Sequence, residues 1–264
     1  VRYSYDSPIE TYEINVIGTA NVLEVARSCS NLKAIVNITT DKCYENDGRS
    51  HGYSEDDSIG GRDPYSSSKG CAELVASSYY RSFLKDQSIG LASVRAGNVI
   101  GGGDWAEDRL IPDILRSFEK GESVVIRNPK ATRPWQHVLE PLSGYLILAQ
   151  KIYNDQNRYA EGWNFGPNEQ DVRPVDWILD KMIYKWPNSS WKLDQNSNPH
   201  EAEFLKLDIS KAKLKLGWKP IWGLAYTLEK IIDWHKSWLE KEDMQATCLA
   251  EIEEYTKDMN NENC

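Results

Sequence analysis

The sequence predicts an α/β protein built on a parallel sheet, and three observations support this fold class. Helical patterns alternate with short apolar runs in the first part of the chain. The runs at 34–38 and 89–96 are rich in apolar and β-branched residues, which is typical of strands buried on both faces of a parallel sheet. The segment between these runs is long enough to contain the helix that connects two parallel strands.

The first predicted helix spans residues 8–28. Ser7 can cap it, Pro8 occupies its first position and Glu10 its third, an arrangement known as a capping box. Its apolar residues form a broad stripe, as expected for a helix that packs on one face. The strand at 34–38 should follow this helix directly.

A long loop then leads to a second helix, predicted over residues 63–85. Asp63 is its expected cap, and Pro64 suits its first position because that residue needs no backbone N–H donor. The strand at 89–96 completes the alternating order of helix and strand. The sequence therefore predicts crossover helices between parallel strands.

The second half of the chain has a mixed pattern. The glycine run at 101–103 leads into Asp104 rather than into a helix, so we interpret it as a substrate loop and not as a phosphate-binding turn. The remaining predicted helices lie at 109–120, 139–153, 175–184, 209–216 and 223–239, and short strands lie at 123–127 and 162–166. The acidic tail, residues 241–264, is expected to be frayed.

Composition argues against several classes of function. The net charge of -9 disfavours non-specific binding to nucleic acid or to an anionic membrane. No apolar stretch reaches the ~18 residues of a membrane-spanning helix, and the residues after Val1 do not resemble a signal peptide. The 5 cysteines and 4 histidines lack metal-ligand spacing, so neither a disulfide framework nor a metal site is predicted. We expect a soluble, cytoplasmic protein.

Tyr65 and Lys69 are the first candidates for chemistry. They lie four residues apart near the start of the predicted helix and therefore share one of its faces. An ammonium beside a phenol favours the phenolate, and the unperturbed pKa of a tyrosine is ~10. A phenol prepared in this way can take a hydroxyl proton while a hydride leaves the carbon that carries the hydroxyl.

Thr40, Asp41 and Lys42 are the second set of candidates. They directly follow the strand at 34–38, and ligands of open α/β sheets bind at the carboxyl ends of the strands. In isolation, such a triplet is more simply explained as a loop cap with a solvated lysine, and a tyrosine and lysine on a helix as a solvated face. The combination of both motifs favours a catalytic site.

Two runs carry a resemblance to a known family. Residues 39–46 (Thr-Thr-Asp-Lys-Cys-Tyr-Glu-Asn) and 60–69 (Gly-Gly-Arg-Asp-Pro-Tyr-Ser-Ser-Ser-Lys) resemble the extended short-chain dehydrogenase/reductase family, and within it the nucleotide-sugar 4,6-dehydratases. The resemblance extends over residues 1–240 and is strongest to members that act on CDP-glucose. It implies a Rossmann-like NAD-binding domain and a smaller, mixed α/β nucleotide-sugar domain.

One feature of that cofactor domain does not occur in these residues. A dinucleotide-binding fold needs a Gly-rich turn after its first strand, and the sequence contains no G-x-x-G-x-x-G. We therefore expect a parallel sheet that lacks its first βαβ strands. The resemblance implies an NAD-binding part at 1–101 and 137–166, and a nucleotide-sugar part at 102–136 and 167–240.

The resemblance also implies a reaction, the NAD-dependent dehydration of CDP-glucose in deoxysugar biosynthesis. The sugar is oxidised at C4, loses water across C5 and C6, and receives the hydride back at C6. Tyr65 would take the 4-hydroxyl proton, Lys69 would stabilise the phenolate and hold the nicotinamide ribose, and Thr40 would orient the same hydroxyl. Lys42 would remove the C5 proton, and Asp41 would protonate the departing 6-hydroxyl.

Further positions follow from the same resemblance. Asn15 would support the active-site strand beside the cofactor. A pyrophosphate suits arginine forks, and the residues expected to bind the nucleotide sugar are Asn98, Arg109, Arg127, Arg133, Arg173 and Glu201. Family members pair the helices at 8–28 and 63–85 in a four-helix bundle, so a homodimer or higher homo-oligomer is implied.

Alternative functions stay open at this point. Another nucleotide-sugar 4,6-dehydratase or a 4-epimerase would share most of these motifs, although an epimerase should not need the pair Asp41 and Lys42. A non-catalytic fragment or binding module would follow if the protein has no Gly-rich NAD motif at all. The arginines, taken singly, are more readily explained by surface ion pairs than by ligand binding.

Overall fold

A computed structural model describes residues 1–194 and 205–262. These residues form two compact units, each assembled from separate stretches of chain. Unit 1 contains residues 1–97, 141–166 and 205–219, and unit 2 contains residues 98–140, 167–194 and 220–262. Each unit is described by itself.

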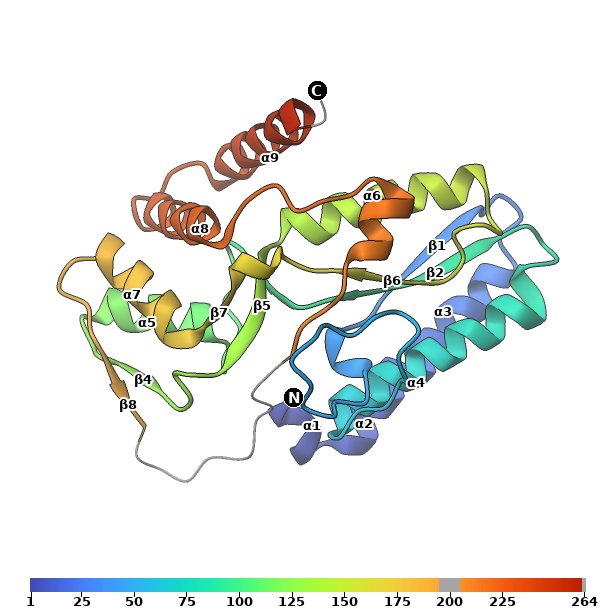
Figure 1. Cartoon of the computed structure of the whole chain (residues 1–264), viewed down its shortest axis with the longest axis horizontal. Coiled ribbons are helices and arrows are strands. Elements are labelled where there is room, and N and C mark those ends of the chain that lie inside the picture. The colour runs from blue at the N-terminus through green and yellow to red at the C-terminus, as the bar shows by residue number, and fades with distance from the viewer. Residues whose placement is uncertain (195–204, 263–264) are drawn as a thin grey trace. The chain divides into compact units, whose positions relative to one another are not determined.

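Unit 1 is built on a parallel sheet, as the sequence predicts. Its strands lie in the order β1 (Ala34–Ile38), β2 (Gly90–Ala96), β6 (Gly162–Phe165), and both pairings are parallel. The helices α3 (Gly18–Arg27) and α4 (Pro64–Tyr79) cover one face, and α6 (Leu139–Asn154) covers the other (Figure 1). The predicted α/β fold class is confirmed.

The two faces of this sheet bury alternate residues of the strands. Ile35 and Leu91 pack with α3 and α4, whereas Ala92 and Val94 pack with α6 and β6. Successive strand side chains point to opposite faces, so a strand covered on both sides is mostly apolar. The apolar character of β1 and β2, apart from Asn37, Ser93 and Arg95, therefore follows from their position between two helical layers.

The predicted helix at 8–28 is present but not uniform. It consists of α2 (Pro8–Tyr12), a π-helical segment η1 (Glu13–Ile17) and α3. A short helix that was not predicted, α1 (Arg2–Asp6), precedes it. Helix α4 continues likewise into a second π-helical segment, η3 (Tyr80–Leu84), and a third, η5 (Ala212–Leu216), lies in the last stretch of unit 1.

The capping box predicted at Ser7 is wrong, because the presence of α1 changes the role of this residue. The Ser7 side chain makes no capping hydrogen bond. The Ser7 backbone N–H already donates to the Tyr3 carbonyl at 2.8 Å and so closes α1, which leaves it unavailable to Glu10. Glu10 instead accepts a hydrogen bond from the Tyr3 hydroxyl.

The start of α4 matches the prediction. The Asp63 carboxylate accepts a hydrogen bond from the Ser66 backbone N–H at 3.0 Å, and Pro64 occupies the first helical position. A cap of this kind stabilises a helix by roughly 1 kcal/mol. The local sequence thus fixes where the helix that carries Tyr65 and Lys69 begins.

Unit 2 contains two small sheets, four α-helices and the short 3-10 helix η4 (Glu169–Asp171) among its described residues. In the first sheet, β5 (Thr132–His137) pairs with β3 (Asn98–Ile100) in parallel and with β7 (Val172–Pro174) in antiparallel orientation. The second sheet pairs β4 (Val124–Ile126) with β8 (Trp191–Leu193) in parallel. The helices are α5 (Leu110–Lys120), α7 (Val175–Lys185), α8 (Leu224–Leu239) and α9 (Met244–Glu262). A single apolar cluster of residues from α5, α7, α8 and the strands forms the core.

The predicted loop at 101–103 packs closely against α8. A Cβ atom added to Gly102 would lie 2.3 Å from the Trp234 ring, and Gly103 has a φ of +75°. Both positions therefore require glycine. The indole of Trp234 fills the space beside this loop.

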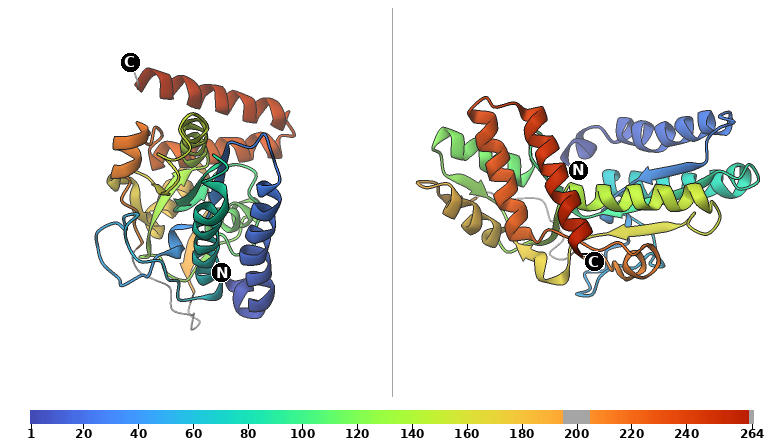
Figure 2. Two further views of the ribbon diagram at one scale, coloured as in Figure 1. Left: turned by 90° about the vertical axis from the view of Figure 1, so that its right-hand side faces the viewer. Right: turned by 90° about the horizontal axis from the view of Figure 1, so that it is seen from above.

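The acidic tail is helical, so the expectation of a frayed tail is wrong. Residues 244–262 form α9, which lies beside α8 (Figure 2). The Tyr255 hydroxyl donates to the Glu140 carboxylate at 2.7 Å, and Trp222 Nε1 donates to Asp258 at 2.9 Å. Acidic composition alone does not show that Glu140 and Trp222, elsewhere in the unit, form hydrogen bonds with side chains of this helix.

The division into units differs from the predicted boundaries in three places. Residues 137–140 belong to unit 2, because unit 1 resumes only at Pro141. Strand β3 (98–100) belongs to unit 2, because it pairs with β5. Residues 205–219 belong to unit 1, because Ile209, Ala212 and Trp218 are buried in its core. No helix among the described residues is long and apolar enough to cross a membrane.

Candidate functional site

Thr40, Asp41 and Lys42 occupy the carboxyl end of β1, where the chain turns into the short 3-10 helix η2 (Asp41–Cys43). Thr40 is extended and caps this turn, because its Oγ1 accepts a hydrogen bond from the Lys42 backbone N–H at 3.3 Å. Its hydroxyl donates to the Asp41 carboxylate at 3.1 Å. Both Thr40 and Asp41 are buried.

Helix α4 brings the predicted phenol and amine to the same region of unit 1. The Lys69 ammonium donates to the carbonyl of Ile38, the last residue of β1, at 3.4 Å. Helix α4 also packs against η2. Burial lowers the pKa of Lys69 below its ordinary value. Lys69 therefore lies next to the strand end that leads into Thr40, Asp41 and Lys42.

A glycine allows the preceding loop to approach the first turn of α4. Gly61 has a φ of +118°, and a Cβ atom at this position would lie 2.4 Å from the Ser67 backbone nitrogen. Only glycine can adopt this conformation and approach without strain. The Gly60-Gly61 pair before the helix is thus a local requirement of the turn that presents Tyr65.

Asn15 lies on the π-helical segment η1, and its side chain reaches α4 rather than strand β1. The Asn15 amide donates to the Ser68 hydroxyl at 2.9 Å, and that hydroxyl donates to the Tyr65 carbonyl at 2.7 Å. Ser68 stands directly before Lys69. Asn15 therefore contacts the helix turn between Tyr65 and Lys69, whereas the resemblance assigned it to the support of the strand.

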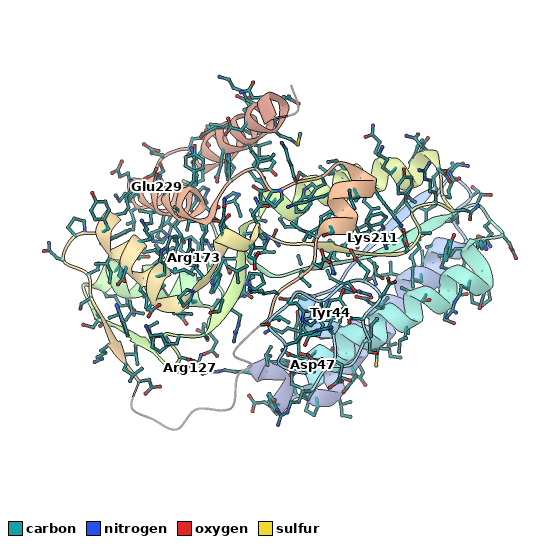
Figure 3. All side chains as sticks on the ribbon, viewed as in Figure 1. Tyr44, Asp47, Arg127, Arg173, Lys211 and Glu229 are labelled. Carbon is teal, nitrogen blue, oxygen red and sulfur yellow. The ribbon has the colours of Figure 1, made fainter. Side chains whose placement is uncertain are left out.

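A buried polar cluster beneath these residues was not predicted. It contains Glu73 of α4, Arg95 of β2, Tyr44 after η2, and Asn164 of β6 (Tyr44 is labelled in Figure 3). Burial raises the pKa of the Tyr44 phenol, which stays protonated at neutral pH and donates to Asn164 at 2.7 Å. Two signals were available in the sequence: Glu73 continues the face of Tyr65 and Lys69, and Arg95 interrupts an otherwise apolar strand.

Three of the residues predicted to bind the nucleotide sugar lie on one sheet of unit 2. Arg133 on β5 stands opposite Arg173 on β7, and Asn98 on β3 stands opposite Trp135 on β5. Residues two apart on a strand, and residues paired across strands, share one face of a sheet. Asn98, Arg133 and Arg173 are therefore on the same face. Arg133 is buried and Arg173 is exposed.

The remaining predicted ligands are placed differently. Arg109 precedes α5, is exposed, and forms an ion pair with Asp104 at 2.9 Å. Arg127 follows β4, in the other sheet of unit 2, and is also exposed (Figure 3). Glu201 lies outside the described residues. Within residues 1–194 and 205–262, no group of histidine, cysteine and acidic side chains could hold a metal ion.

The chain is similar to proteins of a known family. Residues 1–231 match the family model described as GDP-mannose 4,6 dehydratase. The chain is 56% identical to CDP-glucose 4,6-dehydratase of Salmonella typhimurium over 261 residues, which cover 97% of this chain and 73% of that protein. It is 26% identical to UDP-glucuronic acid decarboxylase 1 of Xenopus tropicalis, covering 90% of this chain but only 55% of that protein.

Solved structures share the fold. The dTDP-glucose 4,6-dehydratase of Bacillus anthracis, in complex with NAD, matches with a TM-score of 0.72 at 21% identity, covering 86% of this chain and 68% of that chain. A UDP-glucuronic acid 4-epimerase of Bacillus cereus, in complex with UDP-glucuronic acid and NAD, also matches with a TM-score of 0.72 at 21% identity, covering 84% and 67%. At this level of identity the likeness concerns the fold.

Proposed function

The chain belongs to the family described as GDP-mannose 4,6 dehydratase, and from this premise we propose that it is the greater part of an NAD-dependent CDP-glucose 4,6-dehydratase. The observation that carries the proposal is the 56% identity, over 97% of this chain, to a protein of that name. The placement of Lys69 at the end of β1, beside Thr40, Asp41 and Lys42, is what such a reaction requires.

The residues of unit 1 fit one end of NAD. Lys69 offers a desolvated ammonium at the carboxyl end of a parallel sheet, and this is where α/β folds bind nucleotides. The ammonium would hold the nicotinamide ribose. The Gly-rich turn that binds the pyrophosphate of NAD does not occur in these residues. When bound, NAD accepts a hydride from the sugar and later returns it.

The chain's own groups supply the proton transfers of the proposed reaction. Tyr65 takes the proton of the 4-hydroxyl, and the Lys69 ammonium on the same helix face favours the phenolate that results. Thr40, buried at the strand end, orients that hydroxyl. Once C4 is a ketone, Lys42 removes the proton from C5, and Asp41 gives a proton to the departing 6-hydroxyl. When the hydride returns to C6, the protonated Lys42 gives the proton back to C5, and the proton held by Tyr65 replaces the one that Asp41 gave. Water is the only by-product.

The face that carries Asn98, Arg133 and Arg173 is our proposed site for the nucleoside diphosphate. Two arginines opposite each other on paired strands offer the forked donors that suit a pyrophosphate. Arg109 and Arg127 are exposed, so their guanidinium groups are accessible to a ligand. We propose Arg109, Arg127 and Glu201 as further ligands of the nucleotide sugar.

We also propose a homodimer that acts in the cytoplasm. The adjacent helices α3 and α4, together with η1, leave large apolar side chains exposed, including Ile14, Ile17, Val25 and Leu74. Exposed apolar patches of this kind mark interfaces between chains. The cysteines described as free, at positions 29, 43, 71 and 248, are consistent with a reducing compartment.

The test is a substrate comparison with the natural protein, including any residues that precede Val1. The protein is incubated with NAD and with CDP-, UDP- or dTDP-glucose, and the 4-keto product is followed by its absorbance in alkali. We expect the 4-keto sugar from CDP-glucose only. Activity with UDP- or dTDP-glucose alone would overturn the choice of CDP, and epimerised sugar without water loss would overturn the dehydration.

Two substitutions sharpen this test. Tyr65→Phe removes the proton acceptor for the 4-hydroxyl and should lower kcat by about 10²–10⁴-fold, while binding of CDP-glucose stays unchanged. Asp41→Asn should permit oxidation at C4 but block water loss, so that reduced cofactor accumulates. The matched control is Tyr184→Phe, because Tyr184 is 82% exposed on α7. Full activity of Tyr65→Phe would contradict the assigned role.

A further inference from the structure

We propose that the buried ion pair between Glu73 and Arg95 is a positioning device for the proposed active site. It holds the segment that carries Thr40, Asp41 and Lys42 against the helix that carries Tyr65 and Lys69. The inference rests on the proposed function, because it assigns the pair a role in that reaction. Neither residue was identified from the sequence.

The pair is buried and closely hydrogen-bonded. Glu73 and Arg95 are each 4% exposed. Arg95 Nε donates to the two carboxylate oxygens of Glu73 at 2.8 and 3.0 Å, and Nη2 donates at 2.5 Å. An arginine that grips a carboxylate with two nitrogens fixes both position and orientation, whereas a single contact leaves a rotation free. The pair therefore joins α4 to the carboxyl end of β2.

Glu73 also accepts hydrogen bonds from the residues on both sides of Thr40, Asp41 and Lys42. The Thr39 hydroxyl, directly before Thr40, donates to Glu73 Oε1 at 2.6 Å. The Cys43 thiol, directly after Lys42, donates to the same oxygen at 3.4 Å. Burial raises the pKa of Cys43, so the thiol keeps the proton that this contact needs. One carboxylate oxygen thus fixes the two ends of the three-residue site.

Arg95 secures the next residue in the same way. Its Nη1 donates to the Tyr44 hydroxyl at 2.5 Å, and Tyr44 in turn donates to Asn164 Oδ1 on β6 at 2.7 Å. Asn164 Nδ2 donates to the Tyr53 carbonyl at 2.8 Å, which ties down the following loop. The chain leaving β1 is therefore held by groups on α4, β2 and β6.

We call the hydrogen bonds of Glu73 and Arg95 to residues 39–44 the clamp. The position of Glu73 on α4 connects the clamp to Tyr65 and Lys69. Glu73 lies four residues after Lys69 and eight after Tyr65, so the three side chains follow one face of the helix. A shift of the segment 39–44 relative to Glu73 is therefore also a shift relative to Lys69 and Tyr65. Misplacement of a reacting group by about 1 Å can lower a rate by about 10²-fold.

The chemistry of a buried ion pair suggests that Glu73 and Arg95 position residues 39–44 rather than stabilise the fold. Apolar residues of similar size often replace a buried ion pair with no loss of stability, whereas removal of one partner leaves an uncompensated charge. The double variant Glu73→Met with Arg95→Met should consequently fold. In it, Thr39 and Cys43 lose the Glu73 acceptor, so that the Thr39 hydroxyl keeps only the Val94 carbonyl at 3.0 Å, and Tyr44 loses the Arg95 donor. This variant separates the positional role from the structural one.

The experiment compares three variants in the natural protein. These are Glu73→Met/Arg95→Met, the conservative Glu73→Asp, and the control Leu84→Ala, which opens a cavity in the core of unit 1 away from the site. Each is measured for thermal stability, for kcat and KM with CDP-glucose, and for amide hydrogen exchange of the peptide that covers residues 39–45. Amide hydrogen exchange reports how firmly residues 39–45 are held, independently of catalytic activity.

We expect the double variant to keep its melting temperature but to lose about 100-fold in kcat with KM unchanged, and to exchange faster in residues 39–45 alone. Glu73→Asp should recover part of both losses. Leu84→Ala should lower the melting temperature while leaving the exchange of 39–45 relative to its neighbours unchanged. Wild-type kcat and exchange in a folded double variant would overturn the proposal. A double variant that melts much lower and loses kcat only in proportion to unfolding would overturn it too.

The proposed function can fail separately. If the wild-type protein does not dehydrate CDP-glucose and the double variant still exchanges faster in residues 39–45, the clamp on the segment is supported and the proposed substrate is wrong. If the wild-type protein is active and exchange in 39–45 is unchanged by the double variant, the clamp is wrong and the proposed function stands.

Discussion

Lys69 illustrates how burial and chemistry meet at one residue. Its ammonium donates to the Ile38 carbonyl, and loss of solvent lowers its pKa. A lysine whose ammonium is destabilised holds its proton less firmly, and it gains more from an adjacent phenolate. The same environment that prepares the proposed chemistry therefore costs the folded protein some stability.

The pH dependence of unfolding should reveal this cost. The pKa of Lys69 is lower in the folded chain than its value of ~10.4 in the unfolded chain. Between those two values the unfolded state binds more protons, so the stability contributed by this site rises as pH increases through that window. Below the pKa of Lys69 in the folded chain, the cost of burying its ammonium does not change with pH.

Urea unfolding of the wild type and of Lys69→Met, measured from neutral pH to about pH 10, tests the sign. We expect Lys69→Met to be the more stable protein at neutral pH, and the difference to shrink as pH rises. Lys213→Met, on the surface of unit 1, is the control and should show no such trend. A difference that is constant across the range would contradict the desolvated lysine.

At the scale of elements, α9 shows how polar contacts define a helix that composition does not predict. Glu140 is fully buried and accepts hydrogen bonds from the backbone N–H groups of Ile221 and Trp222 and from the Tyr255 hydroxyl. Burial raises the pKa of Glu140, and these donors oppose that rise. The helix thus supplies one donor to a buried carboxylate.

Tyr255→Phe should lower the free energy of unfolding by about 1.5–3 kcal/mol, because it removes a hydrogen bond to a buried carboxylate. Chemical denaturation measures the effect. The loss should be smaller at acidic pH, where Glu140 gains its proton and needs fewer donors. The exposed Tyr184→Phe on α7 should change stability little. An equal effect of both substitutions would contradict the role of Tyr255.

Local signals predicted the elements, and contacts between distant residues account for the failures. Asp63 and Pro64 fixed the start of α4, and Gly121 and Gly217, both with positive φ, fixed the ends of α5 and η5. The capping box at Ser7 does not form because the Ser7 N–H donates to α1. The local sequence does not predict α1.

The same distinction holds for the site. The proximity of Lys69 to the end of β1 was predictable, because a helix face and a strand end are both local patterns. The pair Glu73 and Arg95 was not, since its partners are 22 positions apart and meet only through the packing of α4 on β2. Nor could the sequence place Arg173 opposite Arg133, which requires the antiparallel register of β5 and β7.

At the scale of the whole molecule, the exposed apolar side chains on α3 and α4 predict self-association. Leu74 is 61% exposed on α4, and Ile17 is 55% exposed where η1 meets α3. A charge introduced at either position would have to be desolvated in a dimer. Because neighbouring residues on both helices are apolar, a single introduced charge should be enough to weaken the association.

Leu74→Glu should convert the proposed dimer into a monomer, measured by gel filtration with light scattering. The control is Leu214→Glu on η5, because Leu214 is 85% exposed on a different helix, and it should not change the mass. A monomeric wild type, or a dimer that survives Leu74→Glu with Ile17→Glu, would place the interface elsewhere or exclude it.

The 264-residue chain by itself should not retain NAD. It contains the proposed ribose-binding Lys69 but no Gly-rich turn for the pyrophosphate. After incubation with NAD and gel filtration, the protein peak should carry no cofactor, whereas a longer natural protein with such a turn should carry it. Stoichiometric NAD in the peak of the 264-residue chain would show that another part of it binds the pyrophosphate.

The way the chain is shared between its two units also limits how the protein can be recombined. Each unit draws on three separate stretches of sequence, so no single pair of cuts in the gene releases either one intact. A chimaera that exchanged substrate recognition between relatives would need several matched grafts at once. Residues 205–219, which return late in the chain to the core of unit 1, would have to stay with their original β1, β2 and β6.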